Sequence, residues 1–261
     1  MNTQLSLNYS LVEQTLVNFI RDEITNAGYS KAVFGLSGGV DSAVTAHLAV
    51  RALGKENVFA VLMPYATSNP QHAKDAMDIV YQLECNYLRI EITPMVDAFC
   101  ALDSSMTTLR KGNIMARCRM ITLFDFSAKE HAIVVGTSNK TEILLGYGTL
   151  YGDIACGINP LGDLFKTQIW ELAQHLGIPK HIIDKKPTAD LWQGQTDEGE
   201  FGFSYNEVDQ LFNVLQQKDF TLEELLALGF NEDFILNIQE RVMKNLFKSK
   251  LPPIASVSQC K

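Results

Sequence analysis

Residues 37–42, Ser-Gly-Gly-Val-Asp-Ser, have the composition of a loop that binds phosphate. Glycines let a backbone approach an anion closely, and free N–H groups at a helix N-terminus can donate to it. The hydroxyl groups of Ser37 and Ser42 add donors. The run is neither a Walker A loop nor Gly-x-Gly-x-x-Gly. We expect a polyphosphate to be contacted by Gly35, Leu36, Ser37, Gly38, Gly39, Val40, Asp41 and Ser42.

Asp41 is the unexpected member of this loop. A carboxylate in the first turn of a helix is stabilised by the helix dipole by about 0.3–1 kcal/mol, which is one explanation for it. An anion beside a phosphate site nevertheless repels the ligand unless a cation lies between them. Mg²⁺ bound by Asp41 and the pyrophosphate would resolve that conflict.

The segments around the loop predict an α/β fold. Short apolar runs that end at glycines or prolines are typical of buried parallel strands, and they cover residues 32–36, 58–63, 87–92 and 132–136. Apolar positions at helical spacing predict helices over residues 11–24, 40–53, 71–83, 114–129, 166–176, 205–217 and 231–247. Strands that alternate with such helices indicate a doubly wound parallel sheet with helices on both faces.

The chain lacks a linker or repeat, so we expect a single domain over residues 1–261. Two irregular stretches, 146–163 and 187–202, are long for a compact domain and are therefore candidate binding loops. The phosphate loop lies where open α/β sheets bind their ligands, at the carboxyl end of a strand.

Composition narrows the partners. The net charge is −8, which disfavours a sequence-independent nucleic-acid binder. Five cysteines are scattered without a Cys-x-x-Cys pair, and the N-terminus has no secretory signal, so we expect a cytoplasmic protein with free thiols. No apolar run approaches the roughly 18 residues of a membrane span, so we expect no membrane partner.

The loop at 37–42 resembles the ATP pyrophosphatase loop of the N-type (PP-loop) family, whose members break ATP between its α- and β-phosphates. Further motifs narrow the resemblance to NAD synthetases over about residues 10–253. They lie at residues 111–117, 136–142, 146–153, 159–168, 187–192 and 195–198. The implied fold is that of the adenine nucleotide alpha hydrolases.

The resemblance implies an ATP- and Mg²⁺-dependent ligase. Deamido-NAD would be adenylated on its carboxylate, pyrophosphate would leave, and ammonia would displace AMP to give NAD. The phosphate loop begins near residue 37, so we expect no glutaminase domain before it, and free ammonia as the nitrogen donor. Relatives are homodimers with dinucleotide sites near the interface, and we expect the same arrangement here.

The resemblance also assigns roles on the ATP side. Glu142 would complete the Mg²⁺ site with Asp41, although a solvated surface carboxylate is the alternative. Lys166 opens a helix, where a cation is unfavourable unless an anion is close, and it would contact ATP phosphate during catalysis. Thr137 and Thr188 would contact ATP, although a threonine in such places is often a local hydrogen bonder or cap.

Three residues are assigned to deamido-NAD by the same resemblance. Arg117 would contact it through its planar donor fork, or could instead lie along an apolar surface. Asp153 would bind it and help to position or deprotonate ammonium as a catalytic group, or could be a turn residue. Lys248 would contact it, or could be a helix-end lysine.

Two other classes of protein remain in view. A PP-loop enzyme that modifies tRNA would favour a basic surface and often Cys-x-x-Cys thiols. A module that only senses adenine nucleotide could keep the glycines, but it would not need Asp41, Glu142 and Lys166 together.

Overall fold

The computed structural model describes residues 5–192 and 194–257 of the chain. A sheet of parallel strands lies at its centre in the order β3-β2-β1-β4. The strands are β1 (Lys31–Gly35), β2 (Val58–Leu62), β3 (Asn86–Arg89) and β4 (Ala132–Val134). The chain adds strands on one side of β1 and then places β4 on its other side. The switch point of the sheet, where open α/β folds bind ligands, therefore lies between β1 and β4.

Helices cover both faces of the sheet, as a buried parallel sheet requires. Successive residues of β1 point to opposite faces: Ala32 and Phe34 join one hydrophobic cluster and Val33 joins another. The first cluster is covered by α1 (Tyr9–Asn26), α2 (Val40–Leu53), α3 (Pro70–Leu83), α7 (Lys166–Leu176) and α8 (Lys180–Ile183). The second is covered by α5 (Thr108–Glu130), on which α4 (Thr93–Cys100) packs. The predicted doubly wound fold is confirmed.

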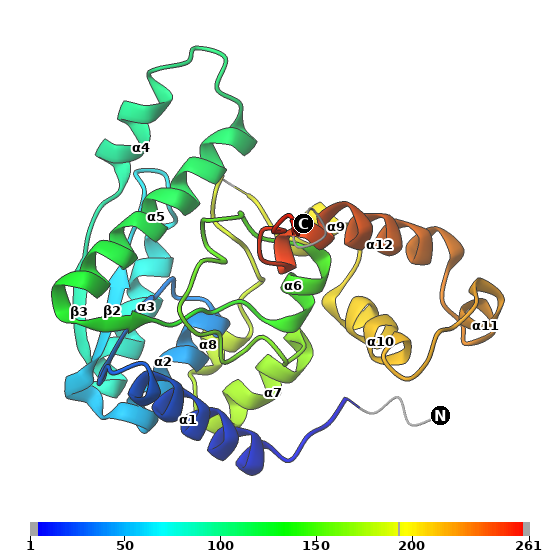
Figure 1. Cartoon of the computed structure of the whole chain (residues 1–261), viewed down its shortest axis with the longest axis horizontal. Coiled ribbons are helices and arrows are strands. Elements are labelled where there is room, and N and C mark those ends of the chain that lie inside the picture. Colours follow the sequence, from blue (N-terminus) through cyan, green and yellow to red (C-terminus); the bar gives the residue numbers. More distant parts are fainter. Residues whose placement is uncertain (1–4, 193, 258–261) are drawn as a thin grey trace.

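A group of helices with its own hydrophobic cluster lies beside the sheet-containing body (Figure 1). Its members are α6 (Lys140–Leu145), α9 (Asp197–Phe201), α10 (Tyr205–Leu215), α11 (Leu222–Ala227) and α12 (Glu232–Asn245). Tyr205 is fully buried at its centre, with the ring of Phe201 packed edge-on at 5.5 Å between centroids. Two 3₁₀ segments complete the fold, η1 (Lys55–Asn57) before β2 and η2 (Leu246–Ser249) after α12.

The helices predicted over residues 40–53 and 166–176 have those bounds in α2 and α7. Helix α5 begins six residues before the predicted position 114, because the side chain of Thr107 caps it by accepting from the Arg110 amide. Strand β4 ends at Val134, and Val135 forms only an isolated bridge with Ile158. The helices that were not predicted have eight residues or fewer, too short for periodicity to reveal, and are α4, α6, α8, α9 and α11.

None of the helices in the described part of the chain has the length and apolar character that a bilayer span needs.

Candidate functional site

The phosphate loop is folded tightly on itself between β1 and α2. The hydroxyl of Ser42 donates to the Gly39 carbonyl at 3.0 Å and accepts from the Ser37 amide at 3.2 Å. The Gly39 amide donates to the Ser37 hydroxyl at 3.1 Å. Gly38 has a φ of +79°, and a Cβ there would lie 2.2 Å from the carbonyl oxygen of His72. Only glycine fits at this position, so the loop keeps an open backbone beside two hydroxyl groups.

Asp41, Glu142 and Lys166 converge next to this loop from three helices. The ammonium nitrogen of Lys166 lies 2.5 Å from Asp41 Oδ2 and 3.6 Å from Glu142 Oε1. Asp41 is in the first turn of α2, Glu142 in that of α6, and Lys166 is the first residue of α7. The Lys166 side chain is 3% exposed and both carboxylates are 17% exposed. The structure therefore places one buried cation between two carboxylates.

The protonation of this cluster follows from its burial. Burial raises the pKa of the Glu142 carboxyl to about 8, and the Asp41 carboxylate adds to the rise while Lys166 opposes it. Burial alone would lower the pKa of the Lys166 ammonium, but the Asp41 and Glu142 carboxylates outweigh it and raise that pKa. Lys166 is thus charged at neutral pH. The raised pKa favours the protonated form of Glu142, so at neutral pH the Lys166 ammonium is balanced mainly by the Asp41 carboxylate.

Further residues, not singled out from the sequence, support the cluster. The side-chain amide of Asn139 donates to Asp41 Oδ1 at 2.9 Å. Asn139 also forms a capping box with Glu142 at the start of α6. The spacing Asn-x-x-Glu is a readable sign of such a box. The ring of Tyr205 lies 5.3 Å from Lys166 Nζ, and its hydroxyl donates to buried Asp197 at 2.9 Å. No local pattern around Tyr205 or Asp197 indicates that contact.

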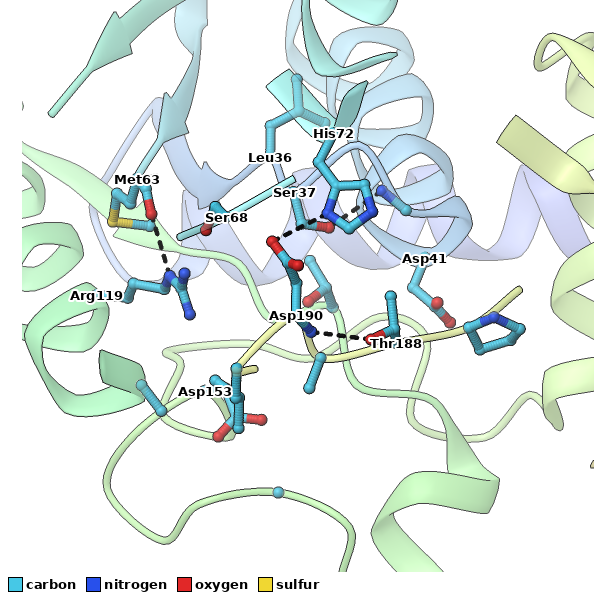
Figure 2. Close-up of a pocket in the computed structure, with 18 of the residues that line it drawn as sticks. Leu36, Ser37, Asp41, Met63, Ser68, His72, Arg119, Asp153, Thr188 and Asp190 are labelled. Atoms are coloured by element: carbon cyan, nitrogen blue, oxygen red, sulfur yellow. Dashed lines mark hydrogen bonds and ion pairs between the residues drawn. The ribbon is translucent and has the colours of Figure 1, made fainter. Parts of the chain in front are cut away.

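A cavity of 1310 Å³ opens beside the loop and the cluster. Its lining includes Thr137 and Thr188 and the predicted residues Gly35, Leu36, Ser37, Gly39, Val40, Asp41, Glu142, Asp153, Lys166 and Lys248. Gly38 and Ser42 are not among the described residues that line it. Figure 2 shows Asp41, Thr188 and Asp153 around this space. The Thr188 hydroxyl accepts from the Asp190 amide at 3.1 Å, so Thr188 makes a local hydrogen bond as well as lining the cavity.

Asp153 lies on the loop that follows α6, and Lys248 lies in η2, which packs against that loop. Asp153 Oδ1 accepts from the Thr149 amide at 2.7 Å, as a turn residue does, and the Asp153 side chain also borders the cavity. Lys248 Nζ donates to the carbonyl groups of Gly146 at 2.8 Å and Gly148 at 3.1 Å. Burial lowers the pKa of the Lys248 ammonium. Lys248 therefore ties η2 to this loop at the edge of the cavity.

Arg117 lies elsewhere. It is not among the described residues that line the large cavity; it lines a separate hollow of 120 Å³ and donates to the Leu150 carbonyl at 3.3 Å. Arg119, which was not predicted, borders the large cavity instead and donates to the Met63 carbonyl at 3.2 Å (Figure 2). Two residues apart on a helix are about 200° apart around its axis, so only one of the two arginines can face the cavity.

Cys85, Cys100, Cys118 and Cys156 carry free thiols, and Cys260 lies outside the described residues. Cys156 is in the loop before α7, where burial raises the pKa of its thiol. That shift disfavours the reactive thiolate form.

Comparisons with known proteins give a consistent result. A family model described as NAD synthase matches residues 12–252. The NH(3)-dependent NAD(+) synthetase of Fusobacterium nucleatum subsp. nucleatum is 52% identical over 98% of this chain and 99% of its own length. Among solved structures, the NH3-dependent NAD synthetase of Campylobacter jejuni subsp. jejuni matches with a TM-score of 0.83 and 37% identity, covering 96% of this chain and 100% of that one. An NMN synthetase from Francisella tularensis matches with a TM-score of 0.84 and 36% identity, covering 96% and 99%.

Proposed function

The chain belongs to the NAD synthase family, and on that premise we propose that it catalyses the ATP-dependent amidation of deamido-NAD with ammonia, the final step of NAD biosynthesis. The reaction forms a C–N bond and releases AMP and pyrophosphate. The observation that carries the proposal is the convergence of Asp41, Glu142 and Lys166 beside a phosphate loop at the switch point of the sheet. A protein that only binds nucleotide does not need this buried set of charges.

Asp41 and Glu142 suit Mg²⁺ as its protein ligands. Carboxylate oxygens are the donors that Mg²⁺ prefers, and both groups lie beside the same ammonium, 2.5 Å and 3.6 Å from its nitrogen. Burial, and next to it the Asp41 carboxylate, raises the pKa of Glu142, so a cation bound beside it would favour its charged form. When bound, Mg²⁺ would neutralise charge on the pyrophosphate that leaves.

The other roles follow from the lining of the cavity. The open backbone of the phosphate loop and the hydroxyl of Ser37 would hold the polyphosphate. The Lys166 ammonium, which donates to Asp41, would also interact with the phosphates and neutralise part of their charge. Thr137 and Thr188 would contact ATP. Asp153, on the loop after α6, and Lys248, in η2, border the same cavity, so deamido-NAD would bind along that side, with Asp153 near the incoming ammonia.

A homodimer would explain the position of Arg117. The hollow that Arg117 lines is bordered by Phe99 and Met106. Further exposed apolar side chains lie on or beside α4 and α5, namely Met95, Leu102, Leu109, Ile121 and Phe124. We propose that a second copy covers this face and that deamido-NAD extends from the large cavity to Arg117 at the interface. Light scattering would test it, because Phe99→Glu should then yield monomers.

We also propose that residues 1–261 act as one synthetase unit that uses free ammonia, as the Fusobacterium nucleatum relative's name and near-complete length match support. The free thiols of the described cysteines suit a reducing, cytoplasmic compartment.

Pyrophosphate release is the test of the reaction. The assay contains ATP, Mg²⁺, ammonium and deamido-NAD, and each component is left out in turn. We expect sustained release, beyond one equivalent per enzyme, to require all four components and to match the formation of NAD, because pyrophosphate leaves before ammonia reacts. Nicotinic acid mononucleotide is the matched alternative acceptor, because one similar structure is described as an NMN synthetase. Faster release with the mononucleotide than with deamido-NAD would identify the mononucleotide as the acceptor. Pyrophosphate release at the same rate with neither acceptor present would refute the synthetase activity.

A further inference from the structure

Lys185 lines the cavity and joins the phosphate loop to α3. It follows α8, and its ammonium donates to the Gly38 carbonyl of the phosphate loop at 2.7 Å. The same ammonium forms an ion pair with Asp75 of α3. The Asp75 side chain is 1% exposed, and its Oδ1 also accepts from the side-chain amide of Gln71 at 2.8 Å. A buried carboxylate that is paired in this way holds its cation in one place.

The bond to Gly38 sets the orientation of one peptide group. The chain has no cis peptide bonds among its described residues, and the C=O and N–H of a trans peptide point in opposite directions. When Lys185 fixes the Gly38 oxygen, it therefore also directs the Gly39 N–H, which points to the hydroxyl of Ser37. That hydroxyl and the Ser42 hydroxyl lie 3.1 Å apart. The Gly39 N–H is thus directed away from Lys185 and toward the pair of serine hydroxyl groups.

Gly38 needs this external support. Its φ of +79° belongs to the left-handed region, and its Cα approaches the His72 carbonyl too closely for any side chain. A glycine pair is also the most flexible part of a loop, because glycine loses more conformational freedom on ordering than any other residue. A fixed hydrogen bond to its carbonyl removes that freedom before the anion arrives.

Helix α3, which contacts Lys185 through Asp75, also contacts the segment that follows Lys185. Asn69, His72 and Asp75 are spaced by three residues, so they lie on one face of the first turns of α3. His72 Nδ1 lies 3.1 Å from Asp190 Oδ2, and the Asn69 amide donates to the same oxygen at 3.2 Å. Asp190 in turn holds Thr188. Helix α3 therefore contacts both ends of residues 185–190, through Asp75 at one end and through His72 at the other. Figure 2 shows the contact between His72 and Asp190.

We propose that Lys185 is a positioning residue for the phosphate loop: with Asp75 it holds the Gly38–Gly39 peptide in the orientation that binds the polyphosphate of ATP. The inference rests on the proposed function only in naming ATP as the ligand. A plainer role is that Lys185 only neutralises Asp75 and so stabilises the fold. The two roles differ in what happens when both charged groups are removed together.

The test compares Lys185→Met with the double variant Asp75→Asn/Lys185→Met. The single variant leaves the buried Asp75 carboxylate without its lysine, beside the His181 imidazole at 3.7 Å and the Gln71 side-chain amide, and should melt at a lower temperature than the wild type. The double variant removes that carboxylate and should recover most of the melting temperature. In both, we expect the Kd for the non-cleavable analogue α,β-methylene-ATP with Mg²⁺ to rise by about ten-fold or more, the weight of one charge-assisted hydrogen bond. Isothermal titration calorimetry measures it.

The matched control is Lys180→Met, which also breaks an ion pair between a lysine and an aspartate, but at a lysine side chain that is 84% exposed. We expect wild-type analogue affinity from it, and an unchanged KM for deamido-NAD from the double variant. A double variant that binds the analogue as tightly as the wild type would show that Lys185 only neutralises Asp75. Equal losses of affinity for ATP analogue and deamido-NAD would also overturn the proposal, because they indicate a collapsed cavity.

The binding measurement does not need the acceptor. If the wild type binds the analogue but forms no NAD, the proposed reaction is refuted, while the comparison of Kd values still decides the role of Lys185. If the wild type does not bind the analogue, both are overturned.

Discussion

Replacing Lys166 with methionine tests the charged cluster directly. The change keeps an unbranched side chain but removes the ammonium that lies 2.5 Å from Asp41 and 3.6 Å from Glu142. Removing one partner of a buried ion pair costs about 3–5 kcal/mol. Both carboxylates keep 17% of their exposure, and Glu142 can take up a proton, so we expect the lower end of that range. About 3 kcal/mol in a chain of this size lowers the melting temperature by about 6–12 °C.

Mg²⁺ should then stabilise the variant more than the wild type. In the wild type a metal ion has to displace the Lys166 ammonium from Asp41 and Glu142, whereas in Lys166→Met it meets two unpaired carboxyl groups. The assay is thermal unfolding without nucleotide, with and without Mg²⁺ at one concentration. Lys180→Met, which removes an exposed lysine, should match the wild type under both conditions. A Lys166→Met protein that is as stable as the wild type without Mg²⁺, or that gains no more from Mg²⁺, would refute this account of the cluster.

Three further predictions concern single groups in and near the site. Asp41→Asn should keep the fold, as circular dichroism would show, and lose about 100-fold or more of the Mg²⁺-dependent turnover; near-normal turnover would leave Asp41 only a helix-end role. The pKa of Glu142 is raised from 4.5 to about 8 in the folded chain, so its contribution to stability is present below pH 4.5 and is lost as the pH rises to about 8. Urea unfolding of the metal-free chain should therefore show that the free energy of unfolding falls as the pH rises across this window. Glu142→Gln should make this fall shallower, and the same fall in the variant as in the wild type would contradict the raised pKa. Arg117→Ala should raise the KM for deamido-NAD more than the KM for ATP. If only Arg119→Ala has this effect, the arginine that contacts deamido-NAD is Arg119, which borders the large cavity.

The sequence by itself determined the scaffold and the position of the phosphate loop. These are local properties: the apolar run of β1, the glycines at 38 and 39, and the helical periodicity of α2 follow one another within about twenty residues. Helix α7 was predictable for the same reason, since its apolar positions repeat and Gly177 ends it. The motifs in the second half indicated the family, and the comparisons confirmed it.

Only the tertiary structure decided which side chains meet. Asp41 and Lys166 are 125 positions apart in the chain, and they touch because β1 and β4 are neighbours whose carboxyl ends share one edge of the sheet. The roles predicted for the site residues remain predictions, but their proximity was not readable from spacing. The direction in which the Arg117 side chain points depends on how α5 is rotated about its axis against the sheet. The spacing of apolar residues does not fix that rotation closely enough to tell which arginine of this helix faces the cavity. Lys185 shows no pattern at all along the chain, because its two partners, Gly38 and Asp75, come from other elements that folding brings to it.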